Sequence, residues 1–519
     1  MFNEFLSNCM SFFFLVPVYI MAKLELWFSS SSFSFKILWV IMQTGKVHVA
    51  LVASPGMGHL IPVLELGKRL VSHHGFSVTI FVVTMDASLS RSQLLRVSEI
   101  KDDFLEIVLL PAVDISARVD KTIGILRQMA MVVHEALPSL RSAILAMEVQ
   151  PIALIVDMFA TEAFVVAEEF MMLKYVFVTT NAWFLALTVH GPNLDKEEER
   201  DDHINNQKPI HIPGCEPVRF VDCYEQFLRR NKVYFRMGTE ISTANGILVN
   251  TFYDLEPRTL AALHDTRKVG LAPKAPVYPI GPLVRPVELS LRGEVLNWLD
   301  MQPKESVLYV SFGSGGTLSA KQTIELAWGL ENSQQRFIWV VRPPVENDSA
   351  ATVFTSNGVY NDFLDYFPEG FLTRTCKNGL VVPKWAPQTE ILSHPSIGGF
   401  LSHCGWNSSL ESIVNGVPMI VWPLYAEQKM NATVLAEHIG VATRSKLLAP
   451  QGVVGRGAIA AMIRKIMVDK EGEVIRAKVK MLKSCAVKAL SNGGTSYNAL
   501  ATVAEECKIG MQRRNAKTG

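Results

Sequence analysis

Short continuous apolar runs alternate with longer stretches of helical spacing from residue 46 onward. Residues 46–54 and 77–84 are rich in β-branched and aliphatic side chains, as in buried parallel strands. Residues 60–73 lie between them and carry apolar side chains at helical spacing. Further strands are predicted at residues 105–110, 153–156 and 174–178. Strands and helices that alternate in this way predict a doubly wound α/β domain.

The same pattern begins again in the second half of the chain. A strand is predicted at residues 306–311, followed by a Gly-rich turn at residues 312–316 and a helix that continues through Leu330. Two more strands are predicted at residues 337–341 and 379–382. The repetition predicts a second α/β domain of the same class.

A Pro-rich segment separates these two blocks. Residues 271–290 contain five Pro and repeated turn signals, which is typical of an interdomain linker. We therefore expect an N-terminal domain at residues 42–270 and a C-terminal domain at residues 291–519, with a ligand cleft between them. Residues 347–361 are mostly small or polar and predict a loop.

Length, charge and cysteine content agree with a two-domain globular protein. A chain of 519 residues and 57.7 kDa is too long for one ordinary core. Its formal net charge is +1, with both signs interspersed, which argues against a nucleic-acid binder. The seven Cys are scattered without a CxxC pair, so the sequence predicts neither a zinc framework nor a disulfide framework. This cysteine usage suits a reducing, cytoplasmic location.

The first 41 residues are interpreted separately from the domains. An apolar run at residues 12–20 allows a signal peptide or signal anchor, and with it a loose membrane association. The run is shorter than the roughly 20 apolar residues that span a bilayer. Residues 1–8 also contain no Lys or Arg, and Met42 directly precedes the first strand. We therefore expect residues 1–41 to be an extension outside the working protein.

The most specific motif occupies residues 385–428, with the sequence WAPQTEILSHPSIGGFLSHCGWNSSLESIVNGVPMIVWPLYAEQ. It resembles the signature box of plant family-1 UDP-sugar glycosyltransferases along its full length, and the likeness extends over nearly all the chain from about residue 45. The resemblance implies a GT-B fold, in which two Rossmann-like domains face each other across a cleft. It also implies a UDP-sugar co-substrate, no cofactor or metal, and a last helix that returns to the N-terminal domain.

Side-chain chemistry supports nucleoside recognition by the start of this box. Trp385 offers a flat face on which uracil can stack. Gln388 can hydrogen-bond the ribose, and Glu411 can accept from both ribose hydroxyls through its two oxygens.

The middle of the box is suited to the diphosphate. A helix is expected to begin near Trp406, itself a candidate donor-binding residue. The ring of His403 and the backbone N–H groups of Asn407 and Ser408 can then meet phosphate oxygens. Cys404 has no second thiolate or His at metal spacing, which makes zinc improbable.

The end of the box, Glu427 and Gln428, can bind the sugar hydroxyls. The resemblance implies a glucose donor, since Gln at the last position accompanies glucose in the family and His accompanies galactose. A second donor loop is expected at residues 311–316, where glycines allow close approach to a diphosphate and Ser314 adds a hydroxyl.

His59 lies in the segment PGMGHLIP, where a strand meets a helix and α/β folds bind their ligands. This segment resembles the catalytic histidine motif of the same family. A competing interpretation is a dinucleotide fingerprint, but Ile61 stands at its third glycine position. A neutral imidazole can deprotonate an acceptor hydroxyl if another group fixes its tautomer. Asp157, at the end of a predicted strand, is the candidate for that role.

These features predict an inverting glucosyltransferase that acts on small phenols as a monomer. Segments such as PGCEPVRF at residues 213–220 resemble the phenylpropanoid branch, which glucosylates monolignols such as coniferyl and sinapyl alcohol. Hydroquinone, flavonoid and anthocyanidin acceptors remain alternatives. A catalytically idle nucleotide-sugar sensor is a further alternative. Loss of His59, Asp157 or Glu427 would mark such a protein, and all three are present.

Overall fold

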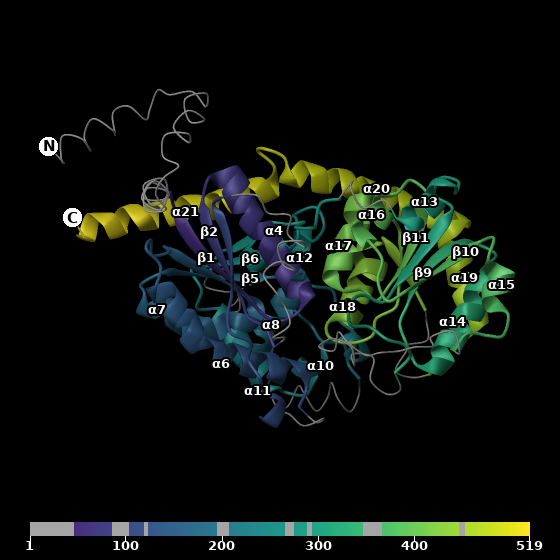
Figure 1. The fold of residues 1–519 in the computed structure, drawn as a ribbon, viewed down its shortest axis with the longest axis horizontal. Helices are drawn as coiled ribbons and strands as arrows, with labels where there is room; N and C mark the ends of the chain where they lie inside the picture. The colour runs from purple at the N-terminus through teal and green to yellow at the C-terminus, as the bar shows by residue number, and fades with distance from the viewer. Residues whose placement is uncertain are drawn as a thin grey trace, which may run out of the picture.

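The structure is a computed structural model, and it describes residues 46–85, 103–118, 123–194, 207–264, 275–287, 293–345, 366–445 and 452–518. Within these ranges, two parallel sheets form the centres of two α/β domains, which lie side by side in Figure 1. This confirms the predicted fold class. The expected extension at residues 1–41 and the expected loop at residues 347–361 fall outside the described residues.

The first sheet has the order β3-β2-β1-β4-β5-β6-β7 and is parallel throughout. Its strands are β1 (His48–Ala53), β2 (Ser77–Val82), β3 (Leu105–Leu109), β4 (Ala153–Asp157), β5 (Leu173–Val178), β6 (Gly246–Val249) and β7 (Val277–Pro279). The strand order reverses between β1 and β4, which pair from Val49 with Ala153 to Val52 with Val156. Ligands of open α/β sheets bind beyond the carboxyl ends of the strands at such a reversal.

The second sheet repeats this arrangement, with the order β10-β9-β8-β11-β12-β13. Its strands are β8 (Val307–Ser311), β9 (Arg336–Val341), β10 (Gly379–Pro383), β11 (Ile397–Ser402), β12 (Met419–Val421) and β13 (Ala442–Arg444). The reversal lies between β8 and β11, whose last residues, Ser311 and Ser402, are paired. Each domain therefore has one switch point at which a ligand can bind.

Helices cover the sheets. In the first domain these are α4 (Met57–His74), α6 (Ile125–Leu145), α7 (Phe164–Glu169), α8 (Ala182–Leu194), α10 (Glu225–Leu228), α11 (Lys232–Ile241) and α12 (Pro257–His264). The second domain has α13 (Glu294–Asp300), α14 (Ala320–Ser333), α15 (Phe371–Thr375), α16 (Gln388–Ser393), α17 (Trp406–Asn415), α18 (Gln428–Thr433), a π-helical turn (Val434–Ile439), α19 (Arg456–Met467) and α20 (Lys470–Leu490). The last helix is α21 (Thr495–Thr518).

Both faces of the first sheet are buried. Successive side chains of a strand point to opposite sides, so each strand contributes to two hydrophobic cores. Along β1, Val49 and Leu51 join a core with α4 and α21, whereas Ala50 and Val52 join a core with α6 and α8. The sequence of β1 therefore reads as a continuous apolar run, as expected for a parallel strand covered on both faces.

Helix α21 runs along the first domain, although it follows the second in sequence (Figure 1). Its apolar residues Leu500 and Val503 pack in the same core as β1 and α4. Glu506 accepts hydrogen bonds from the hydroxyls of Tyr175 on β5 and Tyr278 on β7, both over 2.6 Å. The chain thus passes from the first domain to the second and back.

The segment expected to be a linker, residues 271–290, contains a strand of the first sheet. Strand β7 pairs with β6 from Val277 to Pro279, so the sheet continues beyond residue 270. The five Pro in this segment are typical of a linker, so the strand was not predicted from the sequence. Pro279 is tolerated because β7 is an edge strand, where a missing N–H need not break a ladder.

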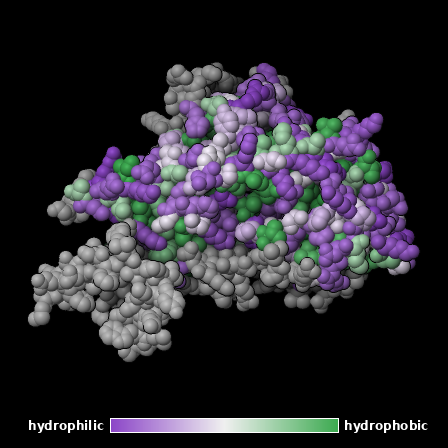
Figure 2. Space-filling model, turned by 90° about the horizontal axis from the view of Figure 1, so that it is seen from above, coloured by the Kyte–Doolittle hydropathy of each residue, from purple (hydrophilic) through white to green (hydrophobic). Residues whose placement is uncertain are grey.

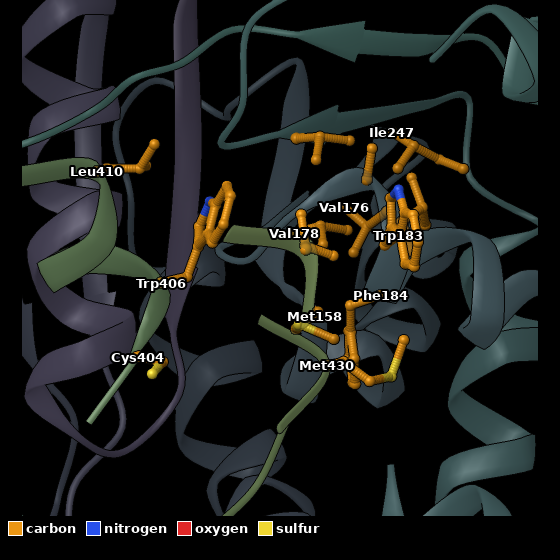
Figure 3. Close-up of a cluster of buried hydrophobic side chains, with 14 of the residues drawn as sticks. Met158, Val176, Val178, Trp183, Phe184, Ile247, Cys404, Trp406, Leu410 and Met430 are labelled. Carbon is orange, nitrogen blue, oxygen red and sulfur yellow. The ribbon is translucent and has the colours of Figure 1, made fainter. Parts of the chain in front are cut away.

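The interface between the domains is partly apolar. One hydrophobic cluster includes Met158, Val178 and Phe184 of the first domain together with Trp406 and Met430 of the second, as drawn in Figure 3. Elsewhere hydrophilic residues cover most of the face shown in Figure 2, with small hydrophobic groups between them. Among the described residues, the structure has no helix that is long and apolar enough to cross a membrane.

Candidate active site

Three residues at the switch point of the first sheet form a buried hydrogen-bonded group. Nδ1 of His59, in the first turn of α4, lies 2.9 Å from Oδ2 of Asp157, the last residue of β4. Ser54, which follows β1, donates to Oδ1 of Asp157 over 2.5 Å. The backbone N–H of Phe159 donates to the same oxygen over 3.0 Å. These donors hold the buried carboxylate in a fixed orientation beneath the imidazole.

The contact with Asp157 also determines the tautomer of His59. A carboxylate can only accept, so Nδ1 carries the proton and Nε2 keeps its lone pair. The His59 side chain is 21% exposed, while that of Asp157 is fully buried. Phe159 lies edge-on to the imidazole, with ring centroids 4.9 Å apart. The geometry leaves one ring nitrogen able to accept a proton from a bound molecule.

Opposing effects act on the basicity of His59. Burial lowers the pKa of its imidazole, but the charge of Asp157 and its hydrogen bond raise it, and the charge of Glu427 raises it further. The resulting pKa lies above the ordinary value for histidine. Glu427 belongs to the second domain, so the base responds to charges from both sides of the interface.

His403 lies at the second switch point, directly after β11. It is 8% exposed, and burial together with the charge of Arg342 lowers its pKa to about 4. The ring is therefore neutral near pH 7 and can donate one hydrogen bond. A Cβ atom at Gly313 or Gly405 would come within 2.5 Å of the His403 ring, so both positions require glycine. Among the described residues, Nδ1 of His403 has no hydrogen-bond partner.

The residues expected to bind the ribose lie together. Nε2 of Gln388 donates to Oε2 of Glu411 over 2.6 Å and lies 2.9 Å from the hydroxyl of Ser408. Burial raises the pKa of Glu411 to about 7, against the lowering effects of the Gln388 hydrogen bond and the Arg285 charge. Trp385 is 62% exposed, which leaves its indole face accessible for stacking.

Two residues expected to contact the donor also bridge the domains. The indole of Trp406 is 3% exposed and donates from Nε1 to the carbonyl oxygen of Asn250 over 2.8 Å. The indole therefore lies in the interface, and the expected contact of Trp406 with the donor stays a prediction. Asn407 donates from Nδ2 to the carbonyl oxygen of Gly58 over 2.7 Å. The backbone N–H groups of the first turn of α17 remain suited to a diphosphate.

The residues expected to bind the sugar and the second donor loop are also placed. Oε1 of Gln428 accepts from the backbone N–H groups of Leu424 and Tyr425, over 2.9 and 3.1 Å. Its amide nitrogen therefore supplies the donors left for a ligand. Ser314 is exposed, and its carbonyl oxygen accepts from Arg342. Among the described residues, no group of three or more His, Cys, Asp or Glu is arranged to hold a metal ion.

Sequence reasoning missed the polar segment that follows β5. Oγ1 of Thr179 lies 3.1 Å from Nδ1 of His59, Thr180 donates to Oε1 of Glu427 over 3.4 Å, and Asn181 contacts Asn431. The signal was available, since three polar residues directly follow an apolar strand. Thr179 also donates to Oδ2 of Asp157 over 3.5 Å, because the carboxyl ends of parallel strands share one edge of the sheet.

Comparisons with known proteins agree with this site. Residues 290–465 match the family model described as UDP-glucoronosyl and UDP-glucosyl transferase. The chain is 50% identical over 480 residues to UDP-glycosyltransferase 72E1 of Arabidopsis thaliana, covering 91% of this chain and 98% of the relative. It is 52% identical over 466 residues to anthocyanidin 3-O-glucosyltransferase 5 of Manihot esculenta, covering 89% and 95%.

A solved structure shares the arrangement of both domains. The crystal structure of TcCGT1 in complex with UDP matches with a TM-score of 0.84 and 48% identity, covering 90% of this chain and all of that chain. The two-domain architecture is thus the GT-B fold, and the donor class is a UDP-sugar. From the family match and these extensive identities we conclude that the chain belongs to the plant family-1 UDP-glycosyltransferases.

Proposed function

We propose that the enzyme transfers glucose from UDP-glucose to the hydroxyl of a small phenol, with inversion at the anomeric carbon. The observation that carries this proposal is the His59–Asp157 pair, in which the carboxylate accepts from Nδ1 and leaves Nε2 of the neutral form to accept a proton. The charge of Glu427 acts on the same imidazole, so a sugar held by Glu427 would lie close to the base. Because the base and the carboxylate assigned to the sugar lie close together, the site favours direct transfer of the sugar to the acceptor.

The reaction takes place in one displacement. Nε2 of His59 takes the proton of the acceptor hydroxyl, whose oxygen forms a bond to the anomeric carbon as the bond to the β-phosphate oxygen breaks. Asp157 stabilises the resulting imidazolium. UDP departs with its charge met by His403, Ser314 and the first N–H groups of α17, those of Asn407 and Ser408.

Each part of the donor has a matching group in the second domain. Trp385 stacks on uracil, and Gln388 and Glu411 bind the ribose. Glu427 and Gln428 bind the glucose hydroxyls. The buried, neutral state of His403 suits a hydrogen-bond donor to a diphosphate oxygen, since its pKa is about 4. In this assignment the second domain binds the donor and the first binds the acceptor.

The acceptor we propose is a phenylpropanoid, with monolignols such as coniferyl and sinapyl alcohol as the first candidates. Phe159 supports an aromatic acceptor, because its ring is partly exposed and stands 4.9 Å from the imidazole of His59. The relative from Manihot esculenta is named for anthocyanidin, another phenolic compound. We further propose that the enzyme acts as a cytoplasmic monomer.

A panel of acceptors and donors tests this function. Purified enzyme is mixed with UDP-glucose, UDP-galactose or UDP-glucuronic acid and with monolignols, hydroquinone, flavonoids or anthocyanidins, and each product is identified. We expect phenolic β-glucosides, formed fastest from UDP-glucose and a monolignol. Faster transfer to a flavonoid or hydroquinone would reassign the acceptor. Absence of transfer to every acceptor, with UDP still bound, would favour the idle nucleotide-sugar sensor.

A further inference from the structure

A pair of buried amides joins the two domains beside the active site. Nδ2 of Asn181 donates to Oδ1 of Asn431 over 2.6 Å, and both side chains are fully buried. Asn181 precedes α8 in the first domain, and Asn431 lies in α18 of the second. A direct hydrogen bond between two buried amides requires both domains to meet in one alignment, since a lost partner would leave a buried polar group without compensation.

The other hydrogen bonds of this pair allow only one orientation of each amide. Nδ2 of Asn431 donates to the carbonyl oxygen of Cys404 over 2.9 Å and lies 3.4 Å from Oε1 of Glu427. Both partners are acceptors, so the oxygen of Asn431 has to face Asn181. Asn181 in turn uses its own oxygen to accept from the backbone N–H of Phe184 over 2.8 Å, which caps α8.

Asn431 therefore contacts two donor-binding parts of the second domain, the turn that follows His403 and the carboxylate of Glu427. Cys404 follows His403 and has a left-handed backbone, with φ of 68°. A non-glycine residue in this region carries strain that its surroundings have to maintain. The hydrogen bond from Asn431 restrains the carbonyl oxygen of Cys404, and thereby the turn between His403 and α17. The contact with Glu427 restrains the carboxylate assigned to the sugar.

On the opposite side of the interface, Asn181 belongs to a segment that touches the base. Thr179, two residues earlier, lies 3.1 Å from Nδ1 of His59, and Thr180 donates to Glu427 over 3.4 Å. Three consecutive residues thus contact the base His59, the carboxylate of Glu427 and the buried amide of Asn431. A shift of Asn431 relative to Asn181 would change the position of Glu427 relative to His59.

We propose that Asn181 and Asn431 are positioning residues that align the donor-binding loop and Glu427 with the base for transfer. This inference rests on the proposed function, because it assigns the pair a role in that reaction. Neither residue touches the reacting atoms. Their effect passes through Cys404, Glu427 and the segment that follows β5.

The substitution Asn181→Ser tests the pair with little disturbance of the first domain. Serine caps helices about as well as asparagine, but its side chain is too short to reach Asn431. Glu437→Gln serves as the matched control, because Glu437 also contacts a residue across the interface, Arg219, and its ion pairs are with Arg219 and Arg444 rather than with the active-site residues. Both variants weaken domain contacts, and only the first removes the buried amide bond.

We expect Asn181→Ser to lower kcat about tenfold or more, the effect of losing a buried hydrogen bond that acts mainly on the transition state. UDP affinity should stay within about twofold of the wild type, since the nucleotide contacts lie in the second domain. Asp157 and Glu427 are the charged groups that act on His59. Displacement of Glu427 should therefore move the acid limb of kcat/KM to lower pH, a change that a merely structural role would not produce.

Asn431→Asp provides a second variant of nearly unchanged shape. Its carboxylate can accept from Asn181 but cannot donate to Cys404 or Glu427, so we expect a larger loss of kcat than for Asn181→Ser. The inference is overturned if wild-type enzyme makes glucosides while both variants match Glu437→Gln in kcat and in the acid limb. If the wild type transfers no sugar at all, the proposed function fails and the inference falls with it.

Discussion

Asn407 donates a hydrogen bond from Nδ2 to the carbonyl oxygen of Gly58 over 2.7 Å, which joins the first turn of α17 to the residue before His59. Helices α4 and α17 begin at the switch points of their own sheets, and they lie next to each other in Figure 1. The base therefore lies at the start of one helix, and the proposed diphosphate site lies at the start of a neighbouring helix in the other domain. The effects of variants at the base and at the proposed donor site can therefore be compared in the same transfer reaction.

The first prediction concerns the base itself. His59→Ala should lower kcat by about a hundredfold to ten-thousandfold, the usual contribution of general acid–base catalysis. UDP-glucose affinity should change little, because the proposed donor contacts lie in the second domain. Steady-state kinetics with a phenolic acceptor and calorimetric titration of UDP-glucose measure the two effects. A variant with wild-type turnover would exclude His59 as the base.

The second prediction concerns Asp157. Asp157→Asn removes the charge and the hydrogen bond that raise the pKa of His59. An amide N–H would face Nδ1, so the imidazole proton would move to Nε2 and block the base. We expect lower kcat, and a smaller effect than that of His59→Ala because imidazole remains present. Activity requires neutral imidazole, so the acid limb of kcat/KM should shift to lower pH. A limb that moves to higher pH would contradict this assignment.

The third prediction uses the pKa of Glu411, which burial raises to about 7. In the proposed site the ionised carboxylate accepts from both ribose hydroxyls, so binding should favour the deprotonated form. UDP-glucose affinity should decrease as pH falls below 7, approaching about tenfold for each pH unit. UDP-glucose suits this titration because its diphosphate ester does not titrate there. In Glu411→Gln the affinity should be weaker at pH 8 and nearly independent of pH. Equal slopes in both proteins would rule out Glu411 as the group responsible.

The fourth prediction concerns donor choice at Gln428. Its oxygen already accepts from Leu424 and Tyr425, so sugar recognition depends on the amide N–H groups. Gln428→Glu preserves the acceptor and removes the donors, and we expect kcat/KM for UDP-glucose to fall about tenfold to a hundredfold. Wild-type enzyme should prefer UDP-glucose over UDP-galactose by a similar factor, because galactose presents an axial 4-hydroxyl.

Gln428→His provides the comparison for this residue. Histidine should erode the preference for UDP-glucose, but it also removes the acceptor used by the loop at Leu424 and Tyr425. We therefore expect an incomplete switch together with lower activity on both donors. Measured kcat/KM values for the two donors in all three proteins decide the matter, and an unchanged ratio in both variants would show that Gln428 does not read the sugar.

The fifth prediction concerns the stability of the first domain. Glu506→Ala removes the acceptor of the hydroxyls of Tyr175 and Tyr278. Each buried hydroxyl left without a partner costs about 1–3 kcal/mol, so the midpoint of thermal unfolding should fall. Glu505→Ala is the control, because the Glu505 side chain is 63% exposed and pairs with Lys508 rather than with the tyrosines. Equal midpoints for the two variants would mean that the Tyr–Glu contact adds no stability.

Sequence patterns predicted the strands that are long and apolar, such as β1 and β2, because buried parallel strands need continuous hydrophobic runs. They missed β6, with four residues, and β7, β12 and β13, with three each, whose pairing depends on neighbours distant in sequence. They also missed β11, which has six residues but includes two glycines. The motif placed His59 and Asp157 as a pair, and the structure brings them to 2.9 Å. This contact was foreseeable because His59 comes shortly after β1 and Asp157 ends the adjacent strand β4.

Other features of the site could not be predicted from the motif. The box gives the identity of Trp406 but not the direction of its indole, which Asn250 in the other domain determines. It includes Gln428 but does not show that the side-chain oxygen of Gln428 accepts a hydrogen bond from the loop backbone at Leu424. The pairing of Asn181 with Asn431 depends on how two domains dock, and residues 250 positions apart leave no local periodic signal.

The return of α21 to the first domain means that this domain does not correspond to one uninterrupted piece of the chain. A fragment that stops at Val287 would lack Leu500, Val503 and Ala504, which cover one face of the first sheet. It would also expose the tyrosine hydroxyls that Glu506 binds. Separate production of the first domain therefore requires residues 495–518 to be supplied as well, fused through a new connection or added as a second peptide.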